Sequence, residues 1–70
     1  MIKAIIDDNQ KCDLCKGSLT FGDSFTDASV PRLGGSWAWL CEVCAVMERV
    51  RYGTGLGQRY DSETKNKIEG

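Results

Sequence analysis

Two short extended runs separated by turn residues form the clearest pattern of apolar and polar positions in the chain. Residues 24–30 (SFTDASV) contain several strand-compatible residues, residues 31–35 (PRLGG) are turn-forming, and residues 36–40 (SWAWL) resume an extended pattern. Extended runs joined by a turn that contains proline and glycine predict a β-hairpin. The second run leads directly into Cys41, so this hairpin would deliver a cysteine at its end.

The hydrophobic period changes after residue 40. Over residues 41–52 apolar residues recur at helical spacing with charged residues between them, which predicts an amphipathic helix. Gly53 follows at a position where glycine commonly ends a helix, so we expect it to be the C-cap. The predicted apolar stripe comprises Val43, Val46, Met47 and Val50.

The remaining segments carry weaker patterns. They predict a short strand over residues 2–6, a polar turn over 7–10, a flexible connector over 53–57 and a second short strand over 58–60. Residues 61–70 are polar, with Ile68 as their one apolar residue, and predict a flexible tail. We therefore expect a single domain over residues 1–60 followed by that tail.

Four cysteines form two matching CxxC units. Two residues between paired cysteines let the chain turn tightly enough for both sulfurs to reach one metal ion at about 2.3 Å. The 25 residues between the two units exceed the roughly 15–20 of the commonest pattern, which leaves room for the hairpin. The spacing predicts one structural zinc ion with four cysteine ligands, Cys12, Cys15, Cys41 and Cys44.

The first cysteine pair lies in a segment that predicts a zinc knuckle, residues 12–17. A glycine often follows the second cysteine of such a turn, because the backbone there needs a positive φ. In this chain Lys16 holds that position and Gly17 comes one residue later, which is a departure from the usual pattern.

Other roles for the cysteines are less well supported. Two disulfides would suit a secreted mini-protein, but the first residues lack the long apolar stretch and cleavage site of a signal peptide. A redox CxxC needs a βαβ context, and catalytic zinc keeps an open coordination position and usually takes histidine or carboxylate ligands. We therefore expect a cytoplasmic protein with reduced thiols. No apolar stretch approaches the 18 residues of a membrane span.

Composition narrows the functional classes. The chain has 9 basic and 10 acidic residues, a formal net charge of −1 and no histidine. Without histidine there is no Ser-His-Asp triad and no histidine-based zinc catalysis, and no other catalytic constellation stands out. We predict a non-enzymatic protein with no small-molecule substrate. Four zinc-bound thiolates would take the formal charge near −3, which favours cationic partners over phosphate backbones.

The order of these elements predicts a small α+β zinc-stabilised domain of treble-clef type. In that arrangement a knuckle and a β-hairpin precede a helix that carries the second cysteine pair. The alternative is a zinc ribbon, in which both pairs lie on hairpin-like knuckles, and the helical stripe favours the treble clef. A helix that begins at Cys41 would also place thiolates at the positive end of the helix dipole, which favours their ionised form.

The two tryptophans share one side of the predicted hairpin. Strand alternation places Trp37 and Trp39 on one face and Ala38 and Leu40 on the other, and the pattern leaves open which face is buried. We expect at least one tryptophan to pack on the helix and shield the zinc sulfurs, because these large rings bury much apolar surface. The second tryptophan would then be partly exposed and able to contact a partner.

Positive charge is concentrated in the middle of the sequence, where residues 31–60 carry a local charge of +2. This concentration suggests, as an alternative function, a nucleic-acid-binding finger that combines arginines with an aromatic side chain. The candidate partner-binding residues are therefore Trp37, Trp39, Arg49, Arg51, Arg59 and Tyr60.

Several of these motifs together resemble small bacteriophage and prophage proteins. Those carry an upstream CxxC, a TDA segment, a WA-x-[ML]-C-x-x-C segment and a glycine-rich stretch ending in GQ-x-Y. This chain has TDA at 26–28, WAWLCEVC at 37–44 and GTGLGQRY at 53–60, and it departs over 45–52. The resemblance implies a phage-encoded protein that works in a bacterial cytoplasm, and it implies no activity. Our first prediction is a structural-zinc module that binds a host or phage protein, with no membrane contact.

Overall fold

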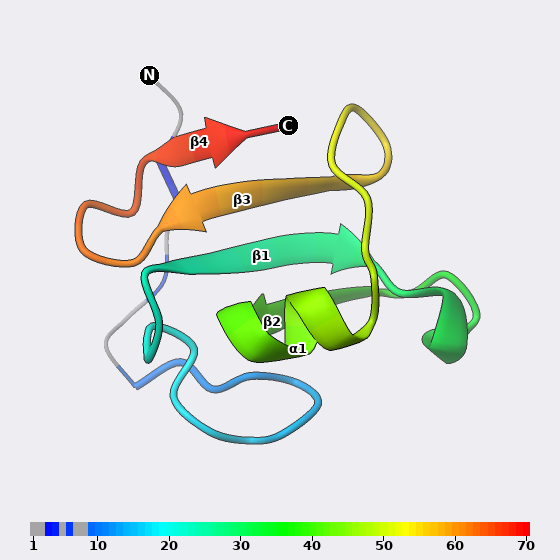
Figure 1. The fold of residues 1–70 in the computed structure, drawn as a ribbon, viewed down its shortest axis with the longest axis horizontal. Helices are drawn as coiled ribbons and strands as arrows, with labels where there is room; N and C mark the ends of the chain where they lie inside the picture. Colours follow the sequence, from blue (N-terminus) through cyan, green and yellow to red (C-terminus); the bar gives the residue numbers. More distant parts are fainter. Residues whose placement is uncertain (1–2, 5, 7–8) are drawn as a thin grey trace.

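An antiparallel sheet with a short helix on one of its faces organises the chain (Figure 1). The computed structural model describes residues 3–4, 6 and 9–70. In chain order the elements are β1 (Ser24–Ser29), a 3₁₀ turn (Pro31–Leu33), β2 (Trp37–Cys41), α1 (Glu42–Met47), β3 (Gly57–Asp61) and β4 (Lys67–Glu69). The 4 strands lie in the order β2-β1-β3-β4. The small α+β class predicted from the sequence is confirmed.

The predicted hairpin is present. β1 and β2 pair antiparallel, with Asp27 opposite Trp39. The turn between them begins with Pro31, whose fixed φ suits the first position of a 3₁₀ turn. It ends at Gly34, whose φ of 70° lies in the left-handed region where a side chain is strained. Proline at one end of the turn and glycine at the other therefore fix the geometry that the sequence indicated.

β3 pairs with the other side of β1, with Phe25 opposite Tyr60. The strand predicted over residues 58–60 is thus present and slightly longer. At its start, a Cβ on Gly57 would meet the carbonyl oxygen of Arg51 at 2.6 Å and the Cβ of Ala28 at 2.7 Å. Only glycine lets the backbone pass this close to β1.

Apolar side chains pack on both faces of the sheet. One cluster lies on the α1 side and comprises Cys12, Val30, Ala38, Leu40, Cys41 and Ala45. A second cluster on the opposite face comprises Leu19, Phe25 and Tyr60, with Ala4, Ile6 and Trp39 packed against it. The sheet therefore separates two small cores, which suits a domain of this size because neither core needs to be large.

The tryptophans do not pack on the helix as expected. Trp39 lies on the face opposite α1, where its ring centroid is 5.7 Å from that of Phe25. Trp37, on the same face, is 48% exposed. Ala38 and Leu40 are the buried residues on the helix side of β2. Trp39 is partly buried against a core cluster and Trp37 is partly exposed, but the expectation that a tryptophan packs on the helix is wrong.

α1 is shorter than predicted, and the three residues of the predicted apolar stripe that it contains face solvent. Val50 lies beyond its end and packs against the cluster on the α1 side. The helix covers Glu42–Met47 rather than residues 41–52. Val43, Val46 and Met47 are 55%, 71% and 74% exposed, respectively. No helix within the described residues is long and apolar enough to cross a lipid bilayer.

The inward face of α1 is set by cysteines rather than by aliphatic residues. Cys41, Cys44 and Ala45 lie at i, i+3 and i+4, so they share one side of the helix. Ala45 is the buried residue of α1, and it packs in the same cluster as Cys41. Because the two sulfurs must point toward the first cysteine pair, the valine stripe is turned outward.

α1 ends in a Schellman motif that the sequence did not indicate. The N–H of Arg49 donates to the carbonyl of Val46 (3.1 Å), and the N–H of Val50 donates to that of Ala45 (3.4 Å). Arg49 has a φ of 53°, the left-handed conformation that glycine usually occupies in this motif. Gly53, the predicted C-cap, lies beyond the end of the helix, so that prediction is wrong.

Residues 61–70 are structured, where the sequence predicted a flexible tail. The Oδ1 of Asp61 accepts hydrogen bonds from the backbone N–H groups of Glu63 (2.9 Å) and Thr64 (2.8 Å), which fixes a turn. β4 then pairs antiparallel with β3 at the edge of the sheet. A polar edge strand gains backbone pairing without burying apolar side chains, so its composition resembles that of a tail.

The strand predicted over residues 2–6 and the turn predicted over 7–10 lie partly outside the described residues. Within the described part, the N–H of Ala4 donates to the carbonyl of Lys65 at 2.8 Å. Lys3 forms an isolated bridge with Asn66. The described N-terminal residues therefore lie beside the turn that precedes β4 (Figure 1).

Replacing Arg49 with glycine should raise the free energy of unfolding by up to about 1 kcal/mol, because glycine adopts the left-handed conformation without a Cβ clash. The greater freedom of glycine in the unfolded chain limits the gain. Denaturant titration of the metal-loaded protein measures the change. Arg51→Gly is the matched control and should not stabilise. Equal destabilisation by both substitutions would contradict the assignment of the cap.

Candidate metal centre

The first cysteine pair lies in a tight turn with the features of a knuckle. The N–H of Cys12 donates to the carbonyl of Gly17 (2.8 Å), and the N–H of Lys16 donates to that of Cys12 (3.0 Å). Lys16 has a φ of 65°, so it takes the conformation that glycine usually supplies after the second cysteine. The N–H of Gly17 points at the sulfur of Cys15, 3.5 Å away. The turn therefore directs both cysteines toward one side.

The second pair spans the junction between β2 and α1. Cys41 is the last residue of β2 and the N-cap of α1, with extended dihedral angles (φ −68°, ψ 167°). Cys44 follows in the first turn of the helix. A change from strand to helix at Cys41 thus brings the two sulfurs of this pair to the same side of the chain.

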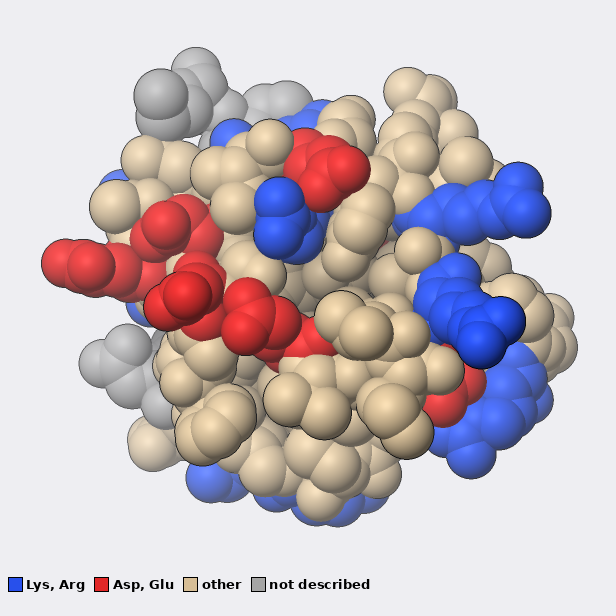
Figure 2. Space-filling model, in the orientation of Figure 1, with Lys and Arg blue, Asp and Glu red and all other residues tan. Residues whose placement is uncertain are grey.

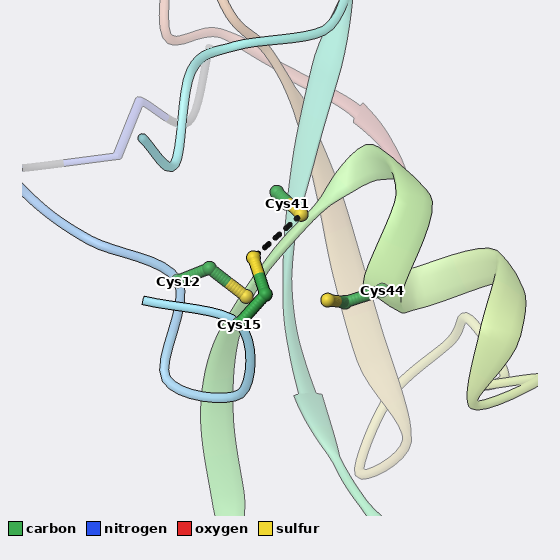
Figure 3. Close-up of side chains that lie close together, drawn as sticks. All are labelled: Cys12, Cys15, Cys41 and Cys44. Carbon is green, nitrogen blue, oxygen red and sulfur yellow. Dashed lines mark hydrogen bonds between the residues drawn. The ribbon is translucent and has the colours of Figure 1, made fainter. Parts of the chain in front are cut away.

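The four sulfurs converge on one point (Figure 3). All of them lie within 4.8 Å of one another, and the Sγ atoms of Cys15 and Cys41 are 3.8 Å apart. A tetrahedron with metal–sulfur bonds of about 2.3 Å has sulfur–sulfur distances of about 3.8 Å. The four cysteines are not joined in disulfides. Their arrangement therefore fits a metal ion held by all four predicted ligands.

Asp13 attaches the knuckle to the hairpin. Its backbone N–H donates to the carbonyl of Trp39, and its carboxylate accepts a hydrogen bond from the N–H of Trp39, both at 2.8 Å. Trp39 lies two residues before Cys41, so these bonds set the separation of the two cysteine pairs. They also close part of the outer edge of β2, which would otherwise present unpaired backbone groups. The sequence shows Asp13 only as one of two residues inside a CxxC unit, and no pattern signals this role.

Burial and the proximity of the other cysteines give the thiols of this cluster different pKa values. Burial raises the pKa of Cys12, but hydrogen bonds from backbone N–H groups and from Cys44 lower it more, and the pKa falls to about 6. Burial raises the pKa of Cys41. Burial also raises the pKa of Cys44, and the neighbouring cysteines raise it further. A divalent cation removes this conflict, because its charge stabilises four thiolates at once.

The exposure of the ligands is uneven. Cys12 and Cys41 are buried, Cys44 is half-buried and Cys15 is exposed. The two buried cysteines belong to the cluster under α1, so the centre is continuous with the core on that side of the sheet. Four thiolate ligands fill a tetrahedral coordination shell, an arrangement typical of structural sites.

The predicted partner-binding residues do not form one surface. Tyr60 is buried with Phe25 and Trp39, with ring centroids 5.5 and 6.1 Å away. Arg59 pairs with Glu69 at 3.1 Å. Arg49 and Arg51 line a separate hollow, together with Val50 and Leu56.

Comparisons with protein-family models, with curated proteins and with solved structures find no match to this chain. The resemblance to small phage proteins therefore stays a prediction. What the molecule does has to be inferred from its own metal centre and surfaces.

Removing the metal should unfold the protein, because metal binding in comparable finger peptides contributes about 10–16 kcal/mol. The variant Cys44→Ser should lose stoichiometric metal and the dispersed amide spectrum of the folded state. Lys16→Ser, in the same knuckle but without a sulfur ligand, should keep both. Elemental analysis and NMR, before and after a strong chelator, measure the outcome. A Cys44→Ser variant or a chelated protein with an unchanged spectrum would show that the fold does not need the metal.

Proposed function

We propose that this chain is a non-enzymatic protein-interaction module of the treble-clef type, folded around one structural zinc ion. The supporting observation is the convergence of four thiols from a knuckle and from the start of a helix, with a hairpin between them in the chain. Soft thiolate ligands in a tetrahedral set favour zinc among the common structural metals. Because the protein supplies all four ligands, no coordination position is left for a substrate.

The surface that we assign to partner binding is the sheet face opposite α1. Trp37 is 48% exposed there, and a half-exposed indole is a common anchor in protein interfaces. Asp27 lies on the same face of the central strand β1, directly opposite Trp39 in the pairing register. Among the described residues, neither salt bridge involves Asp27. An aromatic side chain and an unpaired carboxylate together fit a cationic side chain of a partner protein.

Asp27 carries a cost to folding that binding would remove. Its half-burial raises the pKa of its carboxyl group above the usual value, and the charge of Asp13 raises it further. At neutral pH the ionised form is therefore less stable in the folded protein than in the unfolded chain. A lysine or arginine from a partner would reverse that penalty. The acidic total charge of the zinc-bound protein, near −3, favours the same class of partner.

The nucleic-acid alternative has weaker support. It would use Arg49, Arg51 and Arg59 with Trp37 or Tyr60, but Tyr60 is buried and Arg59 is paired with an acid. Arg49 and Arg51, which neither salt bridge includes, provide too little positive charge for strong binding to a phosphate backbone. We expect no salt-dependent shift in electrophoretic mobility with DNA or RNA.

Asp27→Asn should stabilise the protein at neutral pH while removing the charge. Because the folded-state pKa of Asp27 is raised, stability should increase in the wild type as the pH falls through that pKa. The asparagine variant should lack this component of the pH dependence. Denaturant titrations between pH 7 and pH 4 test this, with metal content checked at each pH. A variant that is less stable than the wild type at pH 7 would contradict the proposed penalty.

Trp37→Ala and Asp27→Asn should both abolish partner binding without unfolding the protein. The zinc-loaded protein, immobilised and exposed to lysate of a bacterial host with and without phage, should retain a protein that both variants lose. Ile68→Ala is the matched control, because Ile68 is 51% exposed and lies on β4, the edge strand that β1 and β3 separate from Trp37 on β2. The retained protein should bind more weakly at high salt and should present a lysine or arginine at the contact. Equal retention by the wild type and both variants would overturn this assignment.

A further inference from the structure

The outer face of α1 carries an apolar surface with no partner among the described residues. Val43, Val46 and Met47 point away from the sheet and are 55%, 71% and 74% exposed. These are three of the six residues of the helix. Contiguous exposed apolar side chains on a helix usually mark a contact with another protein. This surface is distinct from the Trp37 surface, because α1 and Trp37 lie on opposite faces of the sheet.

Acidic residues gather at the N-terminal end of α1. Glu42 is the first residue of the helix, and its carboxylate accepts a hydrogen bond from Ser24 at 3.2 Å. The adjoining hollow is lined by Thr20, Gly22, Asp23, Asp61, Ser62 and Glu63. Figure 2 shows a band of acidic side chains that runs inward from one side of the molecule. We call Asp23, Glu42, Asp61 and Glu63 the acidic end.

Basic residues gather at the C-terminal end of the same helix. Arg49 and Arg51 follow α1 and line one hollow, and no salt bridge of the described residues includes them. Arg32 lies close by, paired with Glu48 at 3.0 Å. Figure 2 shows basic side chains gathered on the opposite side of the molecule from the acidic band. We call Arg32, Arg49 and Arg51 the basic end.

We propose that two copies of this chain associate through α1, packed antiparallel around a two-fold axis that passes near Val46. A two-fold axis perpendicular to the helix reverses its direction in the second copy, so the acidic end of each copy meets the basic end of the other. The apolar side chains of the two helices then bury one another at the centre. An apolar centre with complementary charges at its rim is the usual organisation of a protein interface.

The size of the molecule sets how far this contact must extend. A stable interface of standard size buries about 800 Å² on each partner, a little over a sixth of the 4518 Å² surface of this chain. Three side chains on a helix of six residues do not supply that area. The charged ends must therefore take part, and the association should be weakened by salt, which screens exposed charges within about 10 Å at 0.1 M.

Sedimentation velocity of the zinc-loaded chain tests the proposal. The dimer fraction should rise as the concentration increases from about 10 μM to about 1 mM, and it should fall when salt is raised to 0.5 M. Val46→Asp should weaken association on the order of tenfold or more, because it buries two charges at the axis. Ile68→Asp, on an exposed apolar residue of the edge strand β4 away from α1, should leave it unchanged. A wild type that stays monomeric at every concentration, or equal effects of both substitutions, would overturn the proposal.

Charge reversal identifies the orientation of the pair. Arg49→Glu with Arg51→Glu makes both ends acidic, and Asp23→Lys with Glu63→Lys leaves two acids and two lysines at the acidic end, which cancels its negative charge. Each variant alone should associate on the order of tenfold more weakly than the wild type, because like charges meet at both rims of the first and the attraction at both rims of the second is lost. An equimolar mixture should form heterodimers, because the two acidic ends of the first variant then meet the basic end and the neutralised end of the second. NMR spectra confirm that each variant is folded. Failure of the mixture to associate better than either variant would exclude the antiparallel arrangement.

Discussion

Convergence of four thiols on one point is the constraint on which the rest of this structure depends. It brings the knuckle near residue 15 next to the strand–helix junction near residue 41. The two ends of the chain segment between the cysteine pairs are therefore held together by the cysteine cluster rather than by a large apolar core. The two apolar clusters are small, and the sheet separates them. Asp13, inside the first CxxC unit, connects the knuckle to the sheet through two hydrogen bonds with Trp39 of β2. The metal centre and the hairpin therefore form one structural unit.

The same constraint explains where reading the sequence succeeded and where it failed. The cysteine spacing and the hairpin were predictable, because metal ligation and strand–turn–strand patterns depend on local spacing. The orientation of α1 was not, since a stripe of valines normally marks the buried face of a helix. Here Cys41 and Cys44 must face the knuckle, and Ala45 is carried inward with them. In so short a helix, the convergence of the four sulfurs therefore decides which face is turned inward, and the aliphatic side chains are left exposed.

Other features depended on pairing that no local pattern reveals. β4 is polar and short, and it is held by backbone bonds to β3 and by the turn at Asp61. The alternation of side chains along β2 correctly placed the tryptophans on one face and Ala38 and Leu40 on the other. Because apolar clusters lie on both faces of the sheet, this alternation could not indicate which face α1 covers. No pattern in the sequence indicated the left-handed conformation of Arg49, whereas Lys16 stands at the position after the second cysteine where a positive φ is usual. Tertiary contacts impose these conformations on residues whose type does not favour them.

A metal-stabilised fold also changes what an exposed apolar residue means. In a domain held by its core alone, leaving Val46, Met47 and Trp37 in water would forfeit burial that the fold needs. A metal ion held by the four clustered cysteines would supply that stabilisation and allow these side chains to remain on the surface. They are divided between two opposite faces of the sheet, one bearing Asp27 and the other bearing charges of opposite sign at the two ends of α1. Occupation of one face leaves the other free, so a self-associated pair would present two Trp37 surfaces and could bind a repeated or dimeric partner with increased avidity.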